Sequence, residues 1–356
     1  MLPLRDMKRL GICIAGLNGA VASTLVAGVA LMRRGLAAPR ALLSEPLVRS
    51  HDLATLDDIV IGGWDVRGEN LFQSCLRNRV LGRDRLQPIA KELTGLKPFG
   101  GRASRRAERF GKNLTLQIAG FRRQHKLDTV VVLNLLPTGE HAASSRYALA
   151  ATETGCPFVN FTPNNCGEDK LGPIPYCGRD GKTGQTWLKS VLAPALCARG
   201  LRVTGWYSTN LLGNEDGRVV SDEKRGKSKV AAKTKLLSEM LGYETHHEVH
   251  IAFYPPRGDD KESWDAIDFE GFLGLPMQLK VNGLWRDSIL AAPMCLDLAR
   301  FIELAQRRGE RGPQTWLSLY FKSPYATSVH EFARQEQMLR EYLSAARPAT
   351  PRARGR

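Results

Sequence analysis

The sequence predicts an α/β fold in which a doubly wound, mainly parallel sheet is covered by helices. Short apolar strands alternate with helical patterns along the first half of the chain. Residues 128–134 form an uninterrupted apolar run, which is typical of a parallel strand buried on both faces. The length of 356 residues allows a full hydrophobic core and suggests two domains.

The first unit of this fold is a strand, a glycine turn and a helix. We expect a buried strand over residues 9–15, a turn from Gly16 to Gly19 and an Ala-rich helix over residues 20–33. The N-terminus of such a helix can hold a pyrophosphate, so the unit resembles the opening of a dinucleotide-binding sheet. The glycine spacing differs from G-x-G-x-x-G, and many units of this shape bind nothing.

Polar residues follow the next two predicted strands. The strand over residues 58–65 ends in Gly62, Gly63 and Asp65, and the strand over residues 128–134 ends in Asn134, with Thr138 shortly after. Ligands of open α/β sheets bind beyond the carboxyl ends of the strands, where Asp65 would meet a ribose. The alternative for Asp65 is a solvated carboxylate in a glycine-bearing loop. Between these strands we expect a helix over residues 69–93 and a basic surface excursion from Lys97.

The remaining elements follow in order. Residues 171–185 read as a Gly- and Pro-rich loop, and Thr183, Gly184 and Gln185 open a helix whose N-terminus would attract an anion. We expect helices over residues 147–153, 186–199, 288–308 and 331–346, strands over residues 157–161, 201–208, 246–254, 278–284 and 316–321, and a disordered basic tail over residues 347–356.

A basic element follows the turn at residues 213–217. It carries Lys224, Lys227, Lys229 and Lys233. If the chain is helical from about Ser228, Lys229 and Lys233 lie at i and i+4 on one face, where a phosphate or an oxyanion between them would be bound. A solvated basic face explains the same pattern without any ligand.

Composition limits the function classes. The net charge of +15 favours anionic partners. The seven cysteines include no C-x-x-C pair, which argues against a disulfide framework and a zinc knuckle. The histidines form no metal-binding pattern, so we expect no metal. The apolar residues 10–30 are interrupted by polar ones, which favours a strand and helix over a signal peptide or membrane span. We therefore expect a cytoplasmic protein without a membrane partner. Nucleic acid is not expected as a partner either, because the basic residues 97–126 carry few aromatic residues.

Six short motifs, in order along the chain, resemble those of the myo-inositol-1-phosphate synthase family, also called inositol-3-phosphate synthases. They match the family's strand and turn at the cofactor, D-x-x-[ST]-G-Q-T, L-G-N-N-D-G, G-D-S-K, E-D-S-L-L-A and W-L-K-A-P. In this chain they lie at residues 58–65, 180–186, 212–217, 258–261, 287–291 (with Arg286 in place of the Glu) and 320–324.

The resemblance implies an NAD-dependent isomerase of inositol biosynthesis. Such an enzyme converts D-glucose 6-phosphate to 1L-myo-inositol 1-phosphate by internal oxidation, enolisation, aldol cyclisation and reduction. It also implies a Rossmann-like NAD-binding domain with an inserted α+β catalytic and tetramerisation domain, and a homotetramer. Residues 1–186 and 291–346 would form the NAD-binding domain, and residues 187–290 the insertion.

Residue by residue, the resemblance implies three groups of site residues. Lys229, Lys261 and Lys322 would be catalytic ammonium groups, with Asp180 and Asp287 orienting them. Lys233 would hold the substrate phosphate together with Thr183, Gly184 and Gln185. The residues implied at the cofactor are Gly16, Asn18, Gly19, Asp65, Asn134, Thr138 and Asp216.

The chain departs from the family pattern at the glycine turn. The family usually reads G-L-G-G-N-N-G-S-T, whereas this chain has Asn18 for the second glycine and Ala20, Val21 and Ala22 for the two amides and the last glycine. In the L-G-N-N-D-G motif, Glu215 replaces the second Asn. The first departure affects residues expected near the pyrophosphate.

Two other functions compete with the synthase. One is an NAD-linked enzyme of the same scaffold that acts on another sugar or polyol phosphate. The other is a nucleic-acid or polyanion-binding protein, suggested by the net charge and the basic residues 97–126. Aromatic residues are too sparse in that stretch to form a platform on which bases stack.

Overall fold

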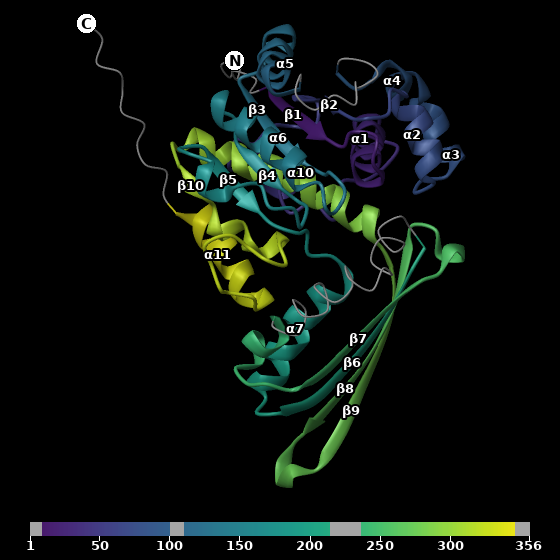
Figure 1. Ribbon diagram of the computed structural model, residues 1–356, viewed down its shortest axis with the longest axis vertical. Coiled ribbons are helices and arrows are strands. Elements are labelled where there is room, and N and C mark those ends of the chain that lie inside the picture. The colour runs from purple at the N-terminus through teal and green to yellow at the C-terminus, as the bar shows by residue number, and fades with distance from the viewer. Residues whose placement is uncertain (1–8, 100–109, 214–235, 346–356) are drawn as a thin grey trace, which may run out of the picture.

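The computed structural model describes residues 9–99, 110–213 and 236–345. They form two sheets, a parallel one built mainly from the first half of the chain and a mixed one that projects away from it (Figure 1). Lys229, Lys233 and Asp216, as well as the tail, lie outside the described residues.

The parallel sheet has the strand order β10-β5-β4-β3-β1-β2. Its strands are β1 (Leu10–Ala15), β2 (Ile59–Trp64), β3 (Thr129–Asn134), β4 (Phe158–Asn160), β5 (Pro175–Gly178) and β10 (Gly312–Pro313). The chain moves from β1 to β2 on one side and returns to β3 on the other side of β1. The strand order therefore reverses between β1 and β3, which is where open α/β sheets bind their ligands.

Helices cover both faces of this sheet because residues of each strand alternate between two apolar cores. Ile12 and Ile14 pack with α1 (Ala20–Arg33) and α10 (Asp287–Arg307), whereas Cys13 and Ala15 pack with α5 (Phe110–His125) and α6 (His141–Glu153). The expected Rossmann-like, doubly wound arrangement is confirmed.

The mixed sheet has the order β7-β6-β8-β9. It consists of β6 (Arg202–Leu212), β7 (His246–Phe253), β8 (Asp260–Glu270) and β9 (Pro276–Arg286), with β6 and β7 parallel and the other pairs antiparallel. Helix α7 (Gly184–Ala198) and the helical residues 236–241 pack on it through Ala193, Trp206 and Leu237.

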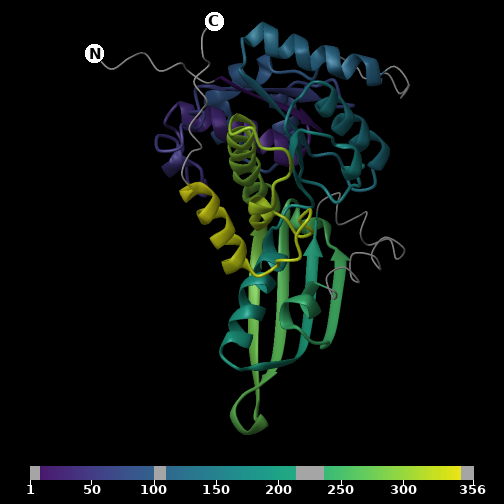
Figure 2. The ribbon, with the colours of Figure 1, turned by 90° about the vertical axis from the view of Figure 1, so that its left-hand side faces the viewer.

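Two connections of the chain join the two parts, and one helix packs on both. The chain leaves the parallel sheet after β5 to enter α7, and returns from β9 into α10. Helix α11 (Phe332–Ser344) lies beside both parts, because it contacts the 3-10 helix η7 (Thr315–Tyr320) and α7 (Figure 2). The loops at these connections bring residues from distant parts of the sequence together.

Three expectations about the extent of helices, strands and loops were wrong. The expected helix over residues 69–93 is broken into α2 (Leu71–Asn78), α3 (Arg83–Leu86) and α4 (Ala90–Gly95), because Arg79 has a left-handed backbone and Pro88 lies in a 3-10 turn. Residues 316–321 belong to the 3-10 helix η7 and not to a strand. The expected loop over residues 171–185 contains β5, which pairs with β4.

The basic excursion after Lys97 contains α5. Its apolar residues Leu114, Ile118 and Phe121 are buried at helical spacing between the charged ones, so the helix covers the sheet. Among the described helices, none has the length and apolar character required to cross a membrane.

Candidate functional site

The glycine turn lies between the ends of β1 and β3, at the reversal of strand order. Gly16 has φ of 90°, and a Cβ there would lie 2.8 Å from the carbonyl oxygen of Leu135. A Cβ on Gly63 would lie 2.0 Å from the carbonyl oxygen of Ile14. Both positions therefore require glycine, and the backbones of β1, β2 and the β3 loop approach closely around the turn.

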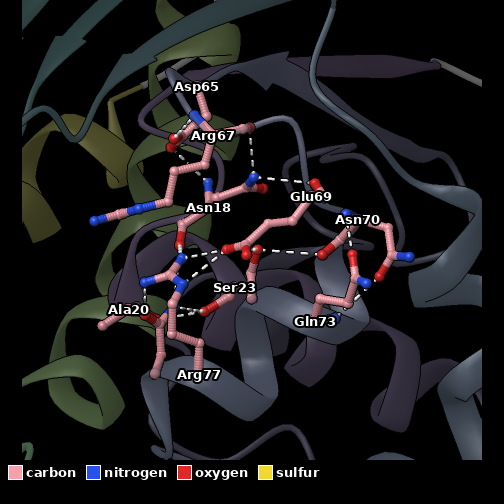
Figure 3. A network of polar contacts seen from close by, with 11 residues as sticks. Asn18, Ala20, Ser23, Asp65, Arg67, Glu69, Asn70, Gln73 and Arg77 are labelled. Atoms are coloured by element: carbon pink, nitrogen blue, oxygen red, sulfur yellow. Dashed lines mark hydrogen bonds and ion pairs between the residues drawn. The ribbon is translucent and has the colours of Figure 1, made fainter. Parts of the chain in front are cut away.

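Asn18 connects this turn to the segment after β2 (Figure 3). Its backbone N–H donates to Asp65 Oδ2 at 2.9 Å, and its Nδ2 donates to the carbonyl oxygens of Arg67 and Glu69 at 3.0 and 3.1 Å. Arg77 Nη2 donates to the Asn18 carbonyl oxygen at 2.8 Å and is itself paired with Glu69. The Asn18 side chain, which stands where the resembled motif has its second glycine, thus links the turn to residues 65–77.

The same turn fits a dinucleotide. Asn18 is fully buried, and its Oδ1 has no hydrogen-bond partner within the described part of the chain. Helix α1 begins directly after Gly19, without a side-chain cap and without an acidic residue in its first turn. The first-turn N–H groups have no acceptor within the helix, so an anion placed there would be bound by them.

Of the expected cofactor residues, Gly16, Asn18, Gly19 and Asp65 come together at this turn. Asn134 lies next to it because Ala15 and Asn134 are partners in the β1–β3 register. The Asn134 side chain is buried and donates to Asn160 Oδ1 at 3.1 Å. Thr138 lies further along the loop after β3 and is half-buried.

A second polar cluster lies where the two sheets meet, and we call it the lysine–carboxylate site. It consists of Asp180, Thr183, Lys261, Asp287 and Lys322. Lys261 Nζ lies 3.8 Å from Asp287 Oδ2, and Thr183 Oγ1 donates to Asp287 Oδ1 at 3.1 Å. Lys322 Nζ donates to Asp180 Oδ1 at 3.0 Å. Four separate segments supply these side chains.

The backbone of residues 178–183 joins the two ion pairs. This segment runs antiparallel to residues 320–325: the Lys182 N–H donates to the Tyr320 carbonyl oxygen at 2.8 Å, and the Lys322 N–H donates to the Asp180 carbonyl oxygen at 2.7 Å. Asp180 has a left-handed backbone with φ of 62°. A Cβ on Gly181 would lie 2.2 Å from the ring of Phe161, so only glycine fits between them.

The structure gives Gln185 a different environment from that of a free phosphate ligand. Its Nε2 donates to Asp265 Oδ2 at 2.8 Å, and its Oε1 accepts from Asn210 Nδ2 at 2.7 Å. Asp265 also accepts from Trp206 and Ser208. The side chain of Gln185 therefore fixes the start of α7 on the mixed sheet, and what it can offer an anion is its backbone N–H.

Asp259 adds a carboxyl group beside this site. Ser288 Oγ donates to Asp259 Oδ1 at 3.0 Å. Burial, together with the charges of Asp287 and Asp260, raises the pKa of Asp259 to about 6. The turn that precedes Lys261 packs tightly against the end of β6, because a Cβ on Gly213 would lie 2.3 Å from the backbone nitrogen of Gly258.

A path of hydrogen bonds connects the glycine-turn region with the lysine–carboxylate site. From Asn134 it passes to Asn160 Oδ1, which also accepts from Thr162 Oγ1 at 2.9 Å, and the Thr162 carbonyl oxygen accepts from the Asp180 N–H at 3.0 Å. Asn160 Nδ2 donates to the Tyr325 hydroxyl at 2.9 Å.

Sequence reasoning assigned no role to Asn160, Thr162, Asp265 or Asn210. The position of Asn160 at the carboxyl end of β4 was the one available signal, because a polar residue also ends β3 and another directly follows β2. Among the described residues, no group of His, Cys, Asp and Glu has the arrangement of a metal site.

Comparison with known proteins gives the same result from the sequence and from the fold. Two family models, both described as myo-inositol-1-phosphate synthase, match residues 184–288 and, for the NAD-binding part, residues 41–144. The inositol-3-phosphate synthase 1 of Bacteroides thetaiotaomicron is 35% identical over 92% of this chain and 91% of its own length. The inositol-3-phosphate synthase isozyme 1 of Arabidopsis thaliana is 27% identical over 97% of this chain and 82% of its own length.

Two solved structures share the fold. The inositol-3-phosphate synthase of Caenorhabditis elegans superposes with a TM-score of 0.85 at 21% identity, over 95% of this chain and 86% of that one. A myo-inositol-1-phosphate synthase-related protein from Thermotoga maritima superposes with a TM-score of 0.74 at 22% identity, over 96% of this chain and all of that one. The chain, with its Rossmann-like NAD-binding domain and its mixed-sheet domain, therefore belongs to the myo-inositol-1-phosphate synthase family.

Proposed function

We propose that this protein is an NAD-dependent inositol-3-phosphate synthase, which converts D-glucose 6-phosphate to 1L-myo-inositol 1-phosphate. The observation that carries the proposal is the lysine–carboxylate site. Two ammonium groups, Lys261 and Lys322, are each held by a carboxylate, and both pairs are attached to the segment of residues 180–183. Family membership supports the same reaction.

The glycine turn would hold the cofactor. Gly16 and Gly19 leave room for the pyrophosphate at the start of α1, Asp65 would accept from a ribose hydroxyl, and Asn134 and Thr138 would border the nicotinamide end. Bound NAD supplies a hydride acceptor and then a hydride donor, so the sugar is oxidised and reduced again without net redox change. The remaining chemistry falls to the side chains of the chain.

Those side chains must stabilise negative charge and move protons. The alkoxide that forms at the C1 oxygen during ring closure would be stabilised by Lys261, whose ammonium group is held by Asp287. Lys322, held by Asp180, would assist proton transfer when the carbon at position 6 loses its proton. Lys229 would act at the C5 oxygen. An ammonium group in a site that is partly shielded from water stabilises an oxyanion more strongly than it would in bulk water.

The substrate phosphate would lie at the start of α7. There the N–H groups of Gly184 and Gln185 and the ammonium group of Lys233 would surround it, and the Thr183 hydroxyl, which donates to Asp287, would border it. Helix α7 has no acidic residue in its first turn, so its N-terminal dipole favours the anion. Gly184 has φ of 55°, which lets the backbone turn into the helix beside the ring of Trp285.

The insertion would occupy residues 187–290, and it would also carry the subunit contacts of a homotetramer. The mixed sheet exposes large apolar side chains, among them Phe272, Leu273 and Leu275 at the tip of the β8–β9 hairpin. Exposed apolar groups of this size are typical of surfaces that associate. Sedimentation of the purified protein measures the oligomeric state directly.

The test is turnover of glucose 6-phosphate with and without NAD. We expect inositol phosphate to form in the presence of NAD, with no accumulation of NADH. A protein that binds NAD but forms no inositol phosphate would support the alternative, an NAD-linked enzyme of the same scaffold. A panel of other sugar and polyol phosphates would then identify its substrate class.

A further inference from the structure

Lys182 is a buried lysine inside the segment that carries the lysine–carboxylate site. It lies between Asp180 and Thr183, yet its side chain is only 5% exposed and contacts α11. Its Nζ donates to Gln335 Oε1. Gln335 is fully buried and donates through Nε2 to the carbonyl oxygen of Val329 at 2.7 Å. The lysine is therefore anchored on a side chain that is itself held in place.

The start of α11 touches two more elements near the site. His330 Nε2 lies 3.2 Å from Glu239 Oε2, in the helical residues 236–241 of the mixed-sheet part. The ring of Phe332 meets the ring of Trp187, in α7, edge-on at 6.3 Å between centroids. Residues 329–335 thus contact the segment of residues 180–183, helix α7 and the mixed-sheet part at once.

Burying a lysine against a neutral partner is energetically unfavourable. Removing an ammonium group from water costs free energy, and an amide oxygen offsets that cost only in part. Burial lowers the pKa of Lys182 to about 7. A methionine would fill the same space without this penalty, so the lysine is a costly choice for packing alone. What the lysine adds is a directional hydrogen bond between residues 180–183 and α11.

We infer that Lys182 and Gln335 are positioning residues, which hold the segment of residues 180–183 so that Asp180 and Thr183 face their lysine–carboxylate partners. This inference rests on the proposed function. Neither residue belongs to an ion pair of the site. They act through Asp180, which fixes Lys322, and through Thr183, which binds Asp287. Displacements of about 1 Å in such a site can cost about 10²-fold in rate.

The test compares substitutions at both ends of the anchor. Lys182→Met and Gln335→Leu should each lower kcat for glucose 6-phosphate at least tenfold, with KM changed less than threefold. Gln335→Glu keeps an acceptor for Lys182 and loses only the donor to the Val329 carbonyl oxygen, so it should retain more kcat than Gln335→Leu. The double variant Lys182→Met/Gln335→Leu should be no slower than the slower single variant, because both remove the same interaction.

Gln337→Leu is the matched control. Gln337 lies on α11 two residues from Gln335 but is exposed, and its Nε2 donates to Glu341 on the same helix. The same substitution there should leave kcat unchanged. Additive effects in the double variant would overturn the inference. Two other results would overturn it: a decrease of kcat in Gln335→Glu equal to that in Gln335→Leu, or an increase of KM without a change of kcat in the Lys182→Met and Gln335→Leu variants.

A second measurement separates this inference from the proposed function. If the wild type forms no inositol phosphate, the proposed function fails, and hydrogen exchange of a peptide covering residues 178–185 decides the positioning role. The Lys182 amide is bonded to Tyr320 and the Asp180 amide to Thr162. These amides should exchange faster in Lys182→Met and Gln335→Leu than in Gln337→Leu. Equal exchange in the three variants would show that the anchor does not hold the segment.

Discussion

The glycine turn and the lysine–carboxylate site are both polar regions at the ends of strands, but they are built from different parts of the chain. In the glycine turn the main constraints are backbone contacts: Gly16 and Gly63 allow close approach, and Asn18 and Asp65 bind backbone groups. In the lysine–carboxylate site the constraints are side-chain pairs between distant segments.

This difference predicts how each region responds to substitution. The turn should respond to changes of shape and of backbone conformation, because its proposed cofactor binding depends on where N–H groups and carbonyl groups lie. The lysine–carboxylate site should respond to changes of charge, because its proposed function depends on ammonium groups. Substitutions of the two kinds test whether the comparison holds, and the largest effect is expected at the lysines.

Lys261→Met should lower turnover by about 10²–10³-fold, because the substitution removes the ammonium group that we propose stabilises developing negative charge. The protein should stay folded, since the methionine keeps most of the side-chain volume. Steady-state formation of inositol phosphate measures the effect. Lys280→Met is the matched control, because Lys280 is an exposed lysine of the same sheet. Activity of Lys261→Met within threefold of the control would contradict the role of Lys261.

Gly16→Ala should destabilise the fold by about 1–3 kcal/mol and weaken NAD binding, because the new Cβ meets the Leu135 carbonyl oxygen in a left-handed conformation. Gly28→Ala is the control. Gly28 lies inside α1, and a Cβ added there would have no atom within 4 Å, so we expect a gain of about 0.5–1 kcal/mol. Urea unfolding and NAD titration measure both variants, and equal stability of the two would refute the backbone argument.

Asn18→Gly should cost about 1–3 kcal/mol, because the hydrogen bonds to the Arg67 and Glu69 carbonyl oxygens are lost. The substitution also restores the glycine that the family has at this position. If Asn18 compensates for the altered turn, NAD affinity should fall as well. Thermal unfolding with and without NAD measures both effects. An unchanged stability together with tighter NAD binding would show that Asn18 impairs the site.

The buried Lys189 should make stability depend on pH. Its Nζ lies 2.6 Å from His247 Nε2, and burial lowers its pKa to about 7, with Asp265 opposing the shift. Because its pKa in the unfolded chain is near 10.5, the unfolded state binds more protons between pH 7 and pH 10. Stability should therefore rise with pH in that range, by on the order of 1 kcal/mol per pH unit.

Lys189→Met should flatten this dependence. Urea unfolding of the wild type and of the variant at pH 7 and pH 9 gives the comparison. The remaining slope in the variant is expected from Lys182, whose pKa burial also lowers to about 7. A slope in Lys189→Met equal to that of the wild type would contradict the assignment to Lys189.

The sequence by itself determined the elements whose information is local. The run of residues 128–134 and the glycine turn specify β3, β1 and α1, because side-chain periodicity and the freedom of glycine act over a few residues. The order of the short motifs identified the family, which the comparisons confirmed. The roles of the individual site residues stay predictions.

Only the tertiary structure decided which distant residues meet. Residues 175–178 read as part of a loop and become β5 because β4 lies beside them. The basic stretch forms α5 because Leu114, Ile118 and Phe121 pack against the parallel sheet. Gln185 has the sequence pattern of an anion ligand, yet Asp265 and Asn210 engage its side chain. The contact of Lys182 with Gln335 spans 153 positions, and no local pattern encodes it. Such contacts depend on how the two sheets and α11 pack together, and packing is a property of the whole chain.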